Sequence, residues 1–396
     1  MMSSFALRST AIRGYLTRTL RRPGAVVGPR PMLASAVRPA AVAAGSGDKK
    51  KLVFLGTPEV AASALEAILD AAEAPDAAFE VHAVVSQPGR PRGRGRSKSG
   101  PPPPSPVAEA AMRRGIPEDM VLCPVKANEP DFLQRLRDME PDLMVTAAYG
   151  NFLPQKFLDI PRLGTLNIHP SLLPQFRGAA PVQRCLERGD AVTGVSVAYT
   201  VLKMDAGPVL RRVEHKLNGD EKHDELLPEL FATGAKALID ALPSVWDGTE
   251  SFDTATPQAD YGDACEAPKT SSEEARMDFI GQNARTLHNK VRGFAGWPGT
   301  KAKFEVRKDG SDEGTVVEVK IITTKVVSDS EAGKEAKAAN GAVELTKNSM
   351  RVPCGGGDWL EVLELQPPGK KAMKAGDYAN GMKGSTLTVV SYGDDE

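Results

Sequence analysis

The chain has 396 residues, of which 50 are basic and 51 acidic, and its formal net charge is −1. This length allows two compact domains and a tail, because single hydrophobic cores stop growing near about 250 residues. No apolar run approaches the roughly 20 residues that span a bilayer, and the four cysteines are too far apart for paired metal ligands, so we expect neither a membrane protein nor a zinc site.

The first 47 residues differ from the rest of the chain. They contain seven arginines, no lysine and no acidic residue. At helical spacing, the apolar Phe5, Ile12, Leu16 and Leu20 share one arc that excludes most of these arginines, as is typical of an organelle transit peptide. We therefore expect residues 1–47 to direct the protein to the mitochondrial matrix, with the plastid stroma or a plain disordered tail as alternatives. Without them, 43 basic residues oppose 51 acidic ones, so binding of nucleic acid would need local basic patches.

After the leader, strand-like and helix-like patterns alternate. The apolar run at 52–55 is followed by a turn and by helical spacing over 59–72. Further strands are expected at 81–86, 143–149, 165–169 and 195–201, and further helices at 107–114, 130–139, 180–188 and 224–241. This alternation predicts an α/β catalytic domain over 48–245, with a doubly wound, mainly parallel sheet that binds ligands beyond the carboxyl ends of its strands.

The last third of the chain has a different pattern. Residues 246–268 are rich in Asp, Thr and Pro and predict an exposed linker. A helix at 279–292 precedes strands expected at 301–306, 315–322, 349–352, 359–365 and 385–390. Five short strands predict a small OB-like β-barrel domain over 269–396, an architecture that often binds nucleic acids. The polar segment 328–340 predicts an inserted disordered loop.

Two polar residues lie in the strand expected at 165–169. Asn167 and His169 are two residues apart, so their side chains project from the same face. Pro170 ends the strand directly after them, which places the pair at a carboxyl end. Alone, the pair would suit a turn-forming Asn beside a core histidine, but the proline-bounded loop that follows favours a functional site.

The run Asn167–Pro174 resembles the signature of the 10-formyltetrahydrofolate-dependent formyltransferases and their hydrolase relatives. The segment Arg177–Arg184 resembles in particular the branch of this family that acts on methionyl-tRNA. Further segments match that branch in order, namely Leu55–Pro58, Gln87–Pro91, Ala148–Gly150, Ser272–Arg276 and Gln366–Met373. The resemblance covers nearly all of the chain from Lys51 onwards. It implies 10-formyltetrahydrofolate as co-substrate and initiator methionyl-tRNA as acceptor; no metal is expected.

Formyl transfer to an amine passes through a tetrahedral intermediate that carries an oxyanion. Such a site needs hydrogen-bond donors for the oxyanion and a group that takes the proton of the amine. Asn167 can offer an amide N–H and His169 an imidazole N–H. Asp205, in the later run Met204–Gly207, can accept the proton or position a water or His169 to do so, although Asp before Ala-Gly is also common in turns. The resemblance implies that these three are the catalytic residues.

The resemblance also implies two binding regions. The expected folate contacts are Tyr149, Phe152, Leu153, Ser171, Leu172, Leu173 and Pro174, where the alternative for Phe152 and Leu153 is ordinary core. The expected tRNA contacts are Arg90, Arg92, Arg94, Arg96 and Lys98 on a flexible loop, and Lys370 and Lys371 in the barrel. Outside a tRNA formyltransferase, such a loop is often a solvated linker.

Two other functions would account for part of this pattern. A folate enzyme that acts on a small molecule such as glycinamide ribonucleotide, or a hydrolase, would use the same catalytic residues but would leave the basic loop and the second domain unexplained. A non-catalytic tRNA-binding protein would leave Asn167, His169 and Asp205 without a role. We expect a monomeric enzyme.

Overall fold

The computed structural model describes residues 49–90, 102–327 and 341–393, which lie within one compact unit that spans residues 45–396. The expected transit peptide and the expected loop at 328–340 lie outside the described residues. No helix in the described ranges is long and apolar enough to cross a bilayer.

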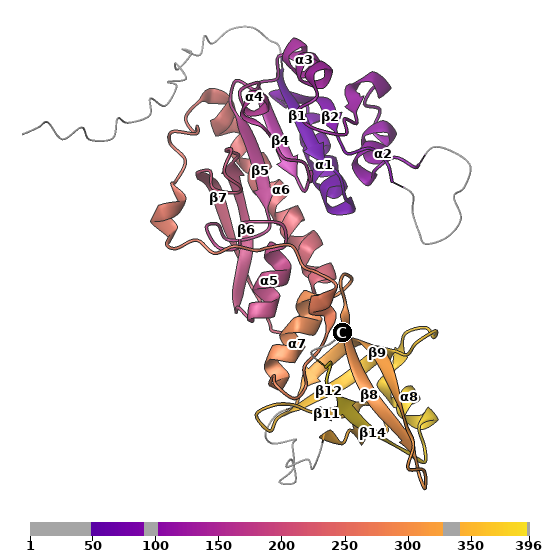
Figure 1. The fold of residues 1–396 in the computed structure, drawn as a ribbon. Coiled ribbons are helices and arrows are strands. Elements are labelled where there is room, and N and C mark those ends of the chain that lie inside the picture. Colours follow the sequence, from indigo (N-terminus) through magenta and orange to yellow (C-terminus); the bar gives the residue numbers. More distant parts are fainter. Residues whose placement is uncertain (1–48, 91–101, 328–340, 394–396) are drawn as a thin grey trace, which may run out of the picture. The chain divides into compact units, whose positions relative to one another are not determined.

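The first half of the chain forms a seven-stranded sheet in the order β3-β2-β1-β4-β5-β6-β7 (Figure 1). Its strands are β1 (Lys50–Gly56), β2 (Phe79–Val85), β3 (Val121–Leu122), β4 (Leu143–Ala147), β5 (Thr165–His169), β6 (Val192–Tyr199) and β7 (Val209–Lys216). Strands β1 to β5 are parallel, whereas β6 is antiparallel to β5 and β7 to β6. The predicted mainly parallel sheet is confirmed; β3 and β7 were not predicted.

Helices cover the two faces of this sheet unequally. They are α1 (Glu59–Ala72), α2 (Pro106–Arg113), α3 (Pro130–Met139), α4 (Gln155–Leu158), α5 (Pro181–Arg188) and α6 (His223–Asp247). Helices α1, α2 and α6 bury one face in a single apolar core. On the other face, α3 and α4 cover only β1 to β4. Over β6 and β7 this second face is covered by the loop that follows β5, where Leu173 packs on Ala198 and Val209.

Gly234 lets α6 lie directly against the back of β5. A Cβ atom at this position would lie 2.5 Å from Ile168 Cγ2 and 2.7 Å from Val195 Cγ2, which is closer than side chains can pack. Ile168 separates Asn167 from His169 in the sequence. The helix therefore supports, from behind, the strand that carries this pair.

The segment expected to be an exposed linker is partly buried. Ala255, Gln258 and Ala267 are buried, as is Trp246 at the end of α6. Thr256 pairs with Val209, and the Arg177 N–H donates to the Cys265 carbonyl (2.9 Å). The prediction was wrong for these residues because a polar composition does not reveal backbone pairing with the edge of the first domain.

The last third forms an antiparallel, barrel-like sheet in the order β10-β11-β12-β9-β8-β14. Its elements are η3 (Glu273–Ala275), α7 (Ala284–Gly293), β8 (Thr300–Lys308), β9 (Gly314–Val326), β10 (Glu344–Leu345), β11 (Met350–Pro353), β12 (Trp359–Gln366), β13 (Met373–Lys374), α8 (Ala375–Gly381) and β14 (Ser385–Val390). A bridge between Ala342 and Thr388 joins the two ends of the sheet. The predicted OB-like barrel is confirmed, and its core includes Phe279, Phe304 and Ile321.

Candidate active site

Thr146 orients the amide of Asn167. The two residues are directly opposite each other on β4 and β5, so their side chains lie on the same face. The Thr146 hydroxyl donates to Asn167 Oδ1 at 2.8 Å. Because the oxygen of the amide is engaged there, Nδ2 points away from β4 with its two hydrogens available as donors. Among the described residues, Nδ2 has no hydrogen-bond partner.

His169 is held by the backbone of the loop that follows it. Its Nε2 lies 3.0 Å from the carbonyl oxygen of Phe176, and the ring is almost fully buried. A carbonyl only accepts hydrogen bonds, so Nε2 carries the proton, and in the neutral ring Nδ1 has a free lone pair. The single N–H of the neutral imidazole is therefore already used, which differs from the expectation that it is free for an oxyanion. Nδ1 can donate only after the ring has gained a second proton.

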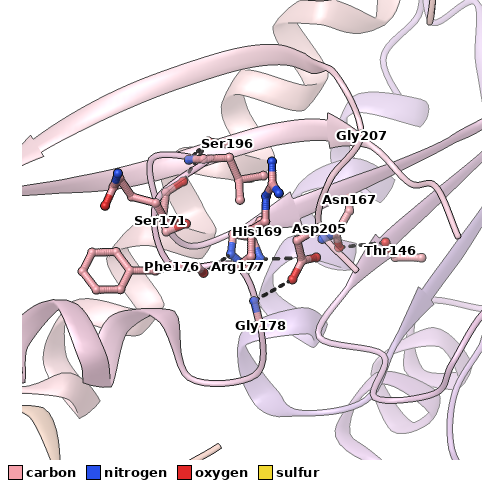
Figure 2. Close-up of polar contacts among 12 residues, drawn as sticks. Thr146, Asn167, His169, Ser171, Phe176, Arg177, Gly178, Ser196, Asp205 and Gly207 are labelled. Atoms are coloured by element: carbon pink, nitrogen blue, oxygen red, sulfur yellow. Dashed lines mark hydrogen bonds and ion pairs between the residues drawn. The ribbon is translucent and has the colours of Figure 1, made fainter. Parts of the chain in front are cut away.

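Asp205 faces the free nitrogen of this ring (Figure 2). Its Oδ1 lies 3.8 Å from His169 Nδ1, and its Oδ2 accepts the backbone N–H of Gly178 at 2.9 Å. Because β6 is antiparallel to β5, the chain leaves β6 beside the start of β5, where the Thr200 N–H donates to the Thr165 carbonyl. The Asp205 loop, residues 200–208, then returns toward His169. The structure thus brings together all three predicted catalytic residues.

Two residues of the site have left-handed backbone conformations. Phe176 has a φ of 59° and Asp205 a φ of 47°, which is uncommon for any residue with a side chain and especially for a bulky one. Phe176 is held by its N–H, which donates to Cys265 Sγ at 3.2 Å, by its carbonyl at His169, and by Arg188, whose guanidinium lies 4.1 Å from the ring centroid. Such strain persists only where the surroundings enforce it, and it concentrates at functional sites.

Sequence reasoning missed Thr146, Gly178 and the Phe176 carbonyl. Thr146 lies in the strand expected at 143–149, but its register with Asn167 is visible only in the structure. Gly178 and Phe176 act through backbone groups, which the residue type does not reveal.

The predicted folate residues lie in two environments. Phe152 is 69% exposed, so the alternative that it is ordinary core is wrong. Tyr149 is buried, which raises the pKa of its hydroxyl. Ser171, Leu172, Leu173 and Pro174 are buried as well; the Ser196 hydroxyl donates to the Ser171 carbonyl and accepts the Leu173 N–H. Burial therefore leaves these side chains little surface for a ligand, and two backbone groups of the segment are already bound to Ser196. Folate contact remains a prediction for all seven residues.

The cavity beside the start of β4 lies apart from the candidate active site. It has a volume of about 620 Å³, is lined by both acidic and basic residues, among them Arg137, Glu140 and Lys156, and contains none of the predicted site residues. Within the described ranges, no three His, Cys, Asp or Glu side chains are grouped as metal ligands would be.

The predicted tRNA residues are only partly described. Arg92, Arg94, Arg96 and Lys98 lie outside the described residues. Arg90 is exposed and donates to Gln87 Oε1 at 2.8 Å. Lys370 and Lys371 are exposed in the turn between β12 and β13, and neither has an ion-pair partner among the residues that the structure describes. Contact with tRNA remains a prediction for these residues.

Comparison with known proteins agrees with this architecture. Residues 50–242 match the family described as Formyl transferase, and residues 269–383 match Formyl transferase, C-terminal domain. The chain is 35% identical over 332 residues to the methionyl-tRNA formyltransferase of Bacillus licheniformis, which covers 84% of this chain and 95% of that protein. It is 36% identical over 331 residues to the methionyl-tRNA formyltransferase of Methylococcus capsulatus, with 83% and 96% covered.

A solved structure shares the fold at much lower identity. The N-formyltransferase from Helicobacter canadensis, in complex with folinic acid and dTDP-3-aminofucose, superposes with a TM-score of 0.53 at 13% identity, covering 80% of this chain and 99% of that one. The parallel sheet with Asn167, His169 and Asp205, followed by the barrel, is the architecture of a one-carbon group transferase. The chain belongs to the formyl transferase family.

Proposed function

We propose that this protein transfers the formyl group of 10-formyltetrahydrofolate to the α-amino group of methionyl-tRNA. The observation that supports this most strongly is the match over both domains to enzymes of that name, which extends over 95% of the length of the Bacillus licheniformis protein. The convergence of Asn167, His169 and Asp205 on one face of the sheet supplies groups suited to the reaction.

The chemistry proceeds through attack of the amine on the formyl carbon. The new N–C bond forms while the carbonyl oxygen becomes an oxyanion, and the bond from the formyl carbon to N10 of the folate then breaks. Asn167 Nδ2, oriented by Thr146, donates to the oxyanion. One proton leaves the amine and one reaches N10, so a group that can take and return a proton is needed.

His169 Nδ1 is suited to carry this proton. Its lone pair is free because Nε2–H is bound to the Phe176 carbonyl. When Nδ1 is protonated, the ring is a cation directly beside the Asp205 carboxylate, which stabilises it. The protonated Nδ1 can also donate to the oxyanion. The role of Asp205 is therefore to stabilise the protonated ring of His169. The Gly178 N–H keeps the carboxylate in place for this role.

The acceptor is bound through basic residues outside the catalytic centre. Because the chain without its leader is acidic overall, phosphate contacts must come from local groups. Lys370 and Lys371, which have no ion-pair partner among the described residues, supply such groups. The arginine-rich segment around Arg94 supplies more. The sequence of residues 1–47 supports import into the mitochondrial matrix, or alternatively the plastid stroma, where this step would serve translation initiation. Expression of residues 1–47 fused to a fluorescent protein tests the import, and a uniformly cytosolic signal would refute it.

A direct assay tests the activity. Protein without residues 1–47 is incubated with labelled 10-formyltetrahydrofolate and methionyl-tRNA, and label in the tRNA is measured. We expect incorporation that depends on the methionyl group. Absence of incorporation, together with transfer to glycinamide ribonucleotide or simple hydrolysis of the folate, would instead support the small-molecule alternative.

A further inference from the structure

Gln258 is a buried residue of the segment between the two domains that makes four hydrogen bonds with its side chain. It begins η2 (Gln258–Tyr261) and is 4% exposed. Its Nε2 donates to the carbonyl oxygens of Asp205 and Gly207, each at 2.7 Å. Its Oε1 accepts from Arg177 Nε at 2.9 Å and from Arg177 Nη2 at 2.7 Å. Every hydrogen-bonding capacity of the amide group is thus used.

The hydrogen-bond partners of Gln258 flank both groups of the bond between Gly178 N–H and the Asp205 carboxylate. Arg177 directly precedes Gly178, whose N–H binds Asp205 Oδ2. The carbonyls of Asp205 and Gly207 flank the same carboxylate on the Asp205 loop. The side chain of Gln258 therefore connects the segment that contains Gly178, the hydrogen-bond donor, to the Asp205 loop, which contains the acceptor carboxylate.

The backbone of the Asp205 loop needs such support. Asp205 has a left-handed φ of 47°, a conformation that residues with side chains adopt only where the surroundings enforce it. A Cβ at Gly207 would lie 1.8 Å from the Tyr199 carbonyl oxygen, so the loop is pressed against β6 at this point. The two hydrogen bonds from Gln258 Nε2 are received by this strained stretch.

We propose that Gln258 is a positioning residue for formyl transfer: it sets the Asp205 carboxylate opposite His169 by joining the Asp205 loop to Arg177. None of its four side-chain hydrogen bonds reaches Asn167 or His169, so it acts through Asp205. This proposal rests on the proposed function for its activity measurement, and a second measurement below is independent of turnover.

An amide is required at position 258 because its oxygen accepts hydrogen bonds from Arg177, whereas its nitrogen donates hydrogen bonds to the Asp205 loop. A glutamate at 258 would still accept from Arg177, but its second oxygen would face two carbonyl oxygens and could not donate to them. A methionine would fill a similar volume and make none of the four bonds. Gln258→Glu therefore removes the connection to the Asp205 loop alone, whereas Gln258→Met removes both connections.

The test compares Gln258→Glu and Gln258→Met with wild type and with Gln134→Met, a matched change on the exposed surface of α3. We expect kcat for formyl transfer to fall about 10- to 100-fold in both Gln258 variants, because small displacements of a catalytic group have effects of this size. The KM values for both substrates should stay within about threefold of wild type, since uniform binding is unaffected. Gln134→Met should behave as wild type.

Amide hydrogen exchange provides the second measurement. In both Gln258 variants, exchange should accelerate in peptides that cover residues 199–209, while peptides from β1, β4 and α1 keep their wild-type protection. A kcat for Gln258→Glu within about twofold of wild type, unchanged exchange of the Asp205 loop, or a loss of protection throughout the domain would each overturn the proposal. Wild-type protein that fails to formylate methionyl-tRNA would refute the proposed function, and the exchange experiment would still decide whether Gln258 holds the loop.

Discussion

Asp205 Oδ1 and His169 Nδ1 face each other across 3.8 Å, a distance too long for a hydrogen bond. The opposite nitrogen of the ring is held at 3.0 Å by the Phe176 carbonyl, and the other carboxylate oxygen at 2.9 Å by the Gly178 N–H. Both groups are thus fixed from behind, and their facing atoms have no other partner among the described residues. Protonation of Nδ1 would place a positive charge in this gap, so the pair is arranged to stabilise the imidazolium.

Asp205→Asn separates the charge of this residue from its hydrogen bond. The asparagine can still accept the Gly178 N–H but carries no charge to stabilise the protonated ring. We expect kcat to fall about 10²-fold, with little change in either KM, by comparison with the loss of other groups that stabilise developing charge. Steady-state kinetics with both substrates checks this, and a near-normal kcat would remove the carboxylate charge from the mechanism.

Replacing His169 tests the other half of the pair. His169→Ala removes the proton carrier and should also lower kcat by about 10²-fold or more. The folate co-substrate should still bind, because the backbone groups of Ser171 to Pro174 are fixed by Ser196 rather than by the imidazole. Equilibrium binding of folate measured with this variant provides the control, and loss of both binding and turnover would indicate a structural role.

Thr146 should matter only through the orientation of Asn167. Thr146→Val keeps the shape and removes the donor to Asn167 Oδ1, which frees the amide to rotate. One hydrogen bond of about 1 kcal/mol corresponds to a decrease in kcat of roughly fivefold. Thr146→Ser retains the hydroxyl and should restore most of the activity. If both variants were equally impaired, the effect would come from packing in β4 instead.

Phe152 offers a test of the folate site with little risk to folding. Its side chain is 69% exposed, so Phe152→Ala should leave the unfolding temperature nearly unchanged. If the ring contacts the folate, KM for 10-formyltetrahydrofolate should rise about tenfold. A tenfold change corresponds to about 1.4 kcal/mol, which is the size expected for partly burying an aromatic ring. Val192→Ala, at an exposed apolar position on β6, is the control. An unchanged KM would exclude Phe152 from the binding site.

Lys370 and Lys371 should contribute to tRNA binding through charge. Lys370→Glu combined with Lys371→Glu should raise KM for methionyl-tRNA and flatten its dependence on salt concentration, because fewer counterions are released on binding. KM for the folate should not change. The double variant Lys216→Glu, Lys236→Glu makes the same change in net charge on the catalytic domain and controls for long-range repulsion. Equal effects of the two double variants would contradict a local contact.

The buried thiol of Cys354 predicts a loss of stability at alkaline pH. Burial raises the pKa of Cys354 from 9.0 to about 12. A group whose pKa is raised by folding stabilises the native state fully below its unfolded pKa, and this contribution is lost as the pH rises from about 9 through about 12. The free energy of unfolding of wild type should therefore fall more steeply between about pH 8 and about pH 10.5 than that of Cys354→Ala. Urea titrations with reductant present measure both slopes; parallel slopes would contradict the prediction.

Local patterns predicted most of the regular elements, because apolar spacing and proline or glycine boundaries are encoded within each element. The helices at 59–72 and 130–139 and the strand at 165–169 have the predicted bounds. The reversed direction of β6 was not predictable in this way. It depends on pairing with β5, yet it decides where the Asp205 loop begins.

The three residues predicted to be catalytic could be proposed from side-chain chemistry and from the family resemblance, but the groups that hold them in place could not. Phe176 and Gly178 act through backbone atoms. Gln258 lies 53 residues beyond Asp205, in a segment whose composition predicted exposure. Contacts of this kind become visible only when distant segments are placed together in three dimensions.

The close approach of α6 to β5 makes the predicted catalytic pair sensitive to changes on the helix-covered face of the sheet. Any side chain at position 234 must push on Ile168 and Val195, and Ile168 can move only together with the residues before and after it. A screen for inactive variants that still fold should therefore recover position 234 alongside the catalytic residues. An inherited substitution at this glycine would damage catalysis without altering any group that a substrate meets.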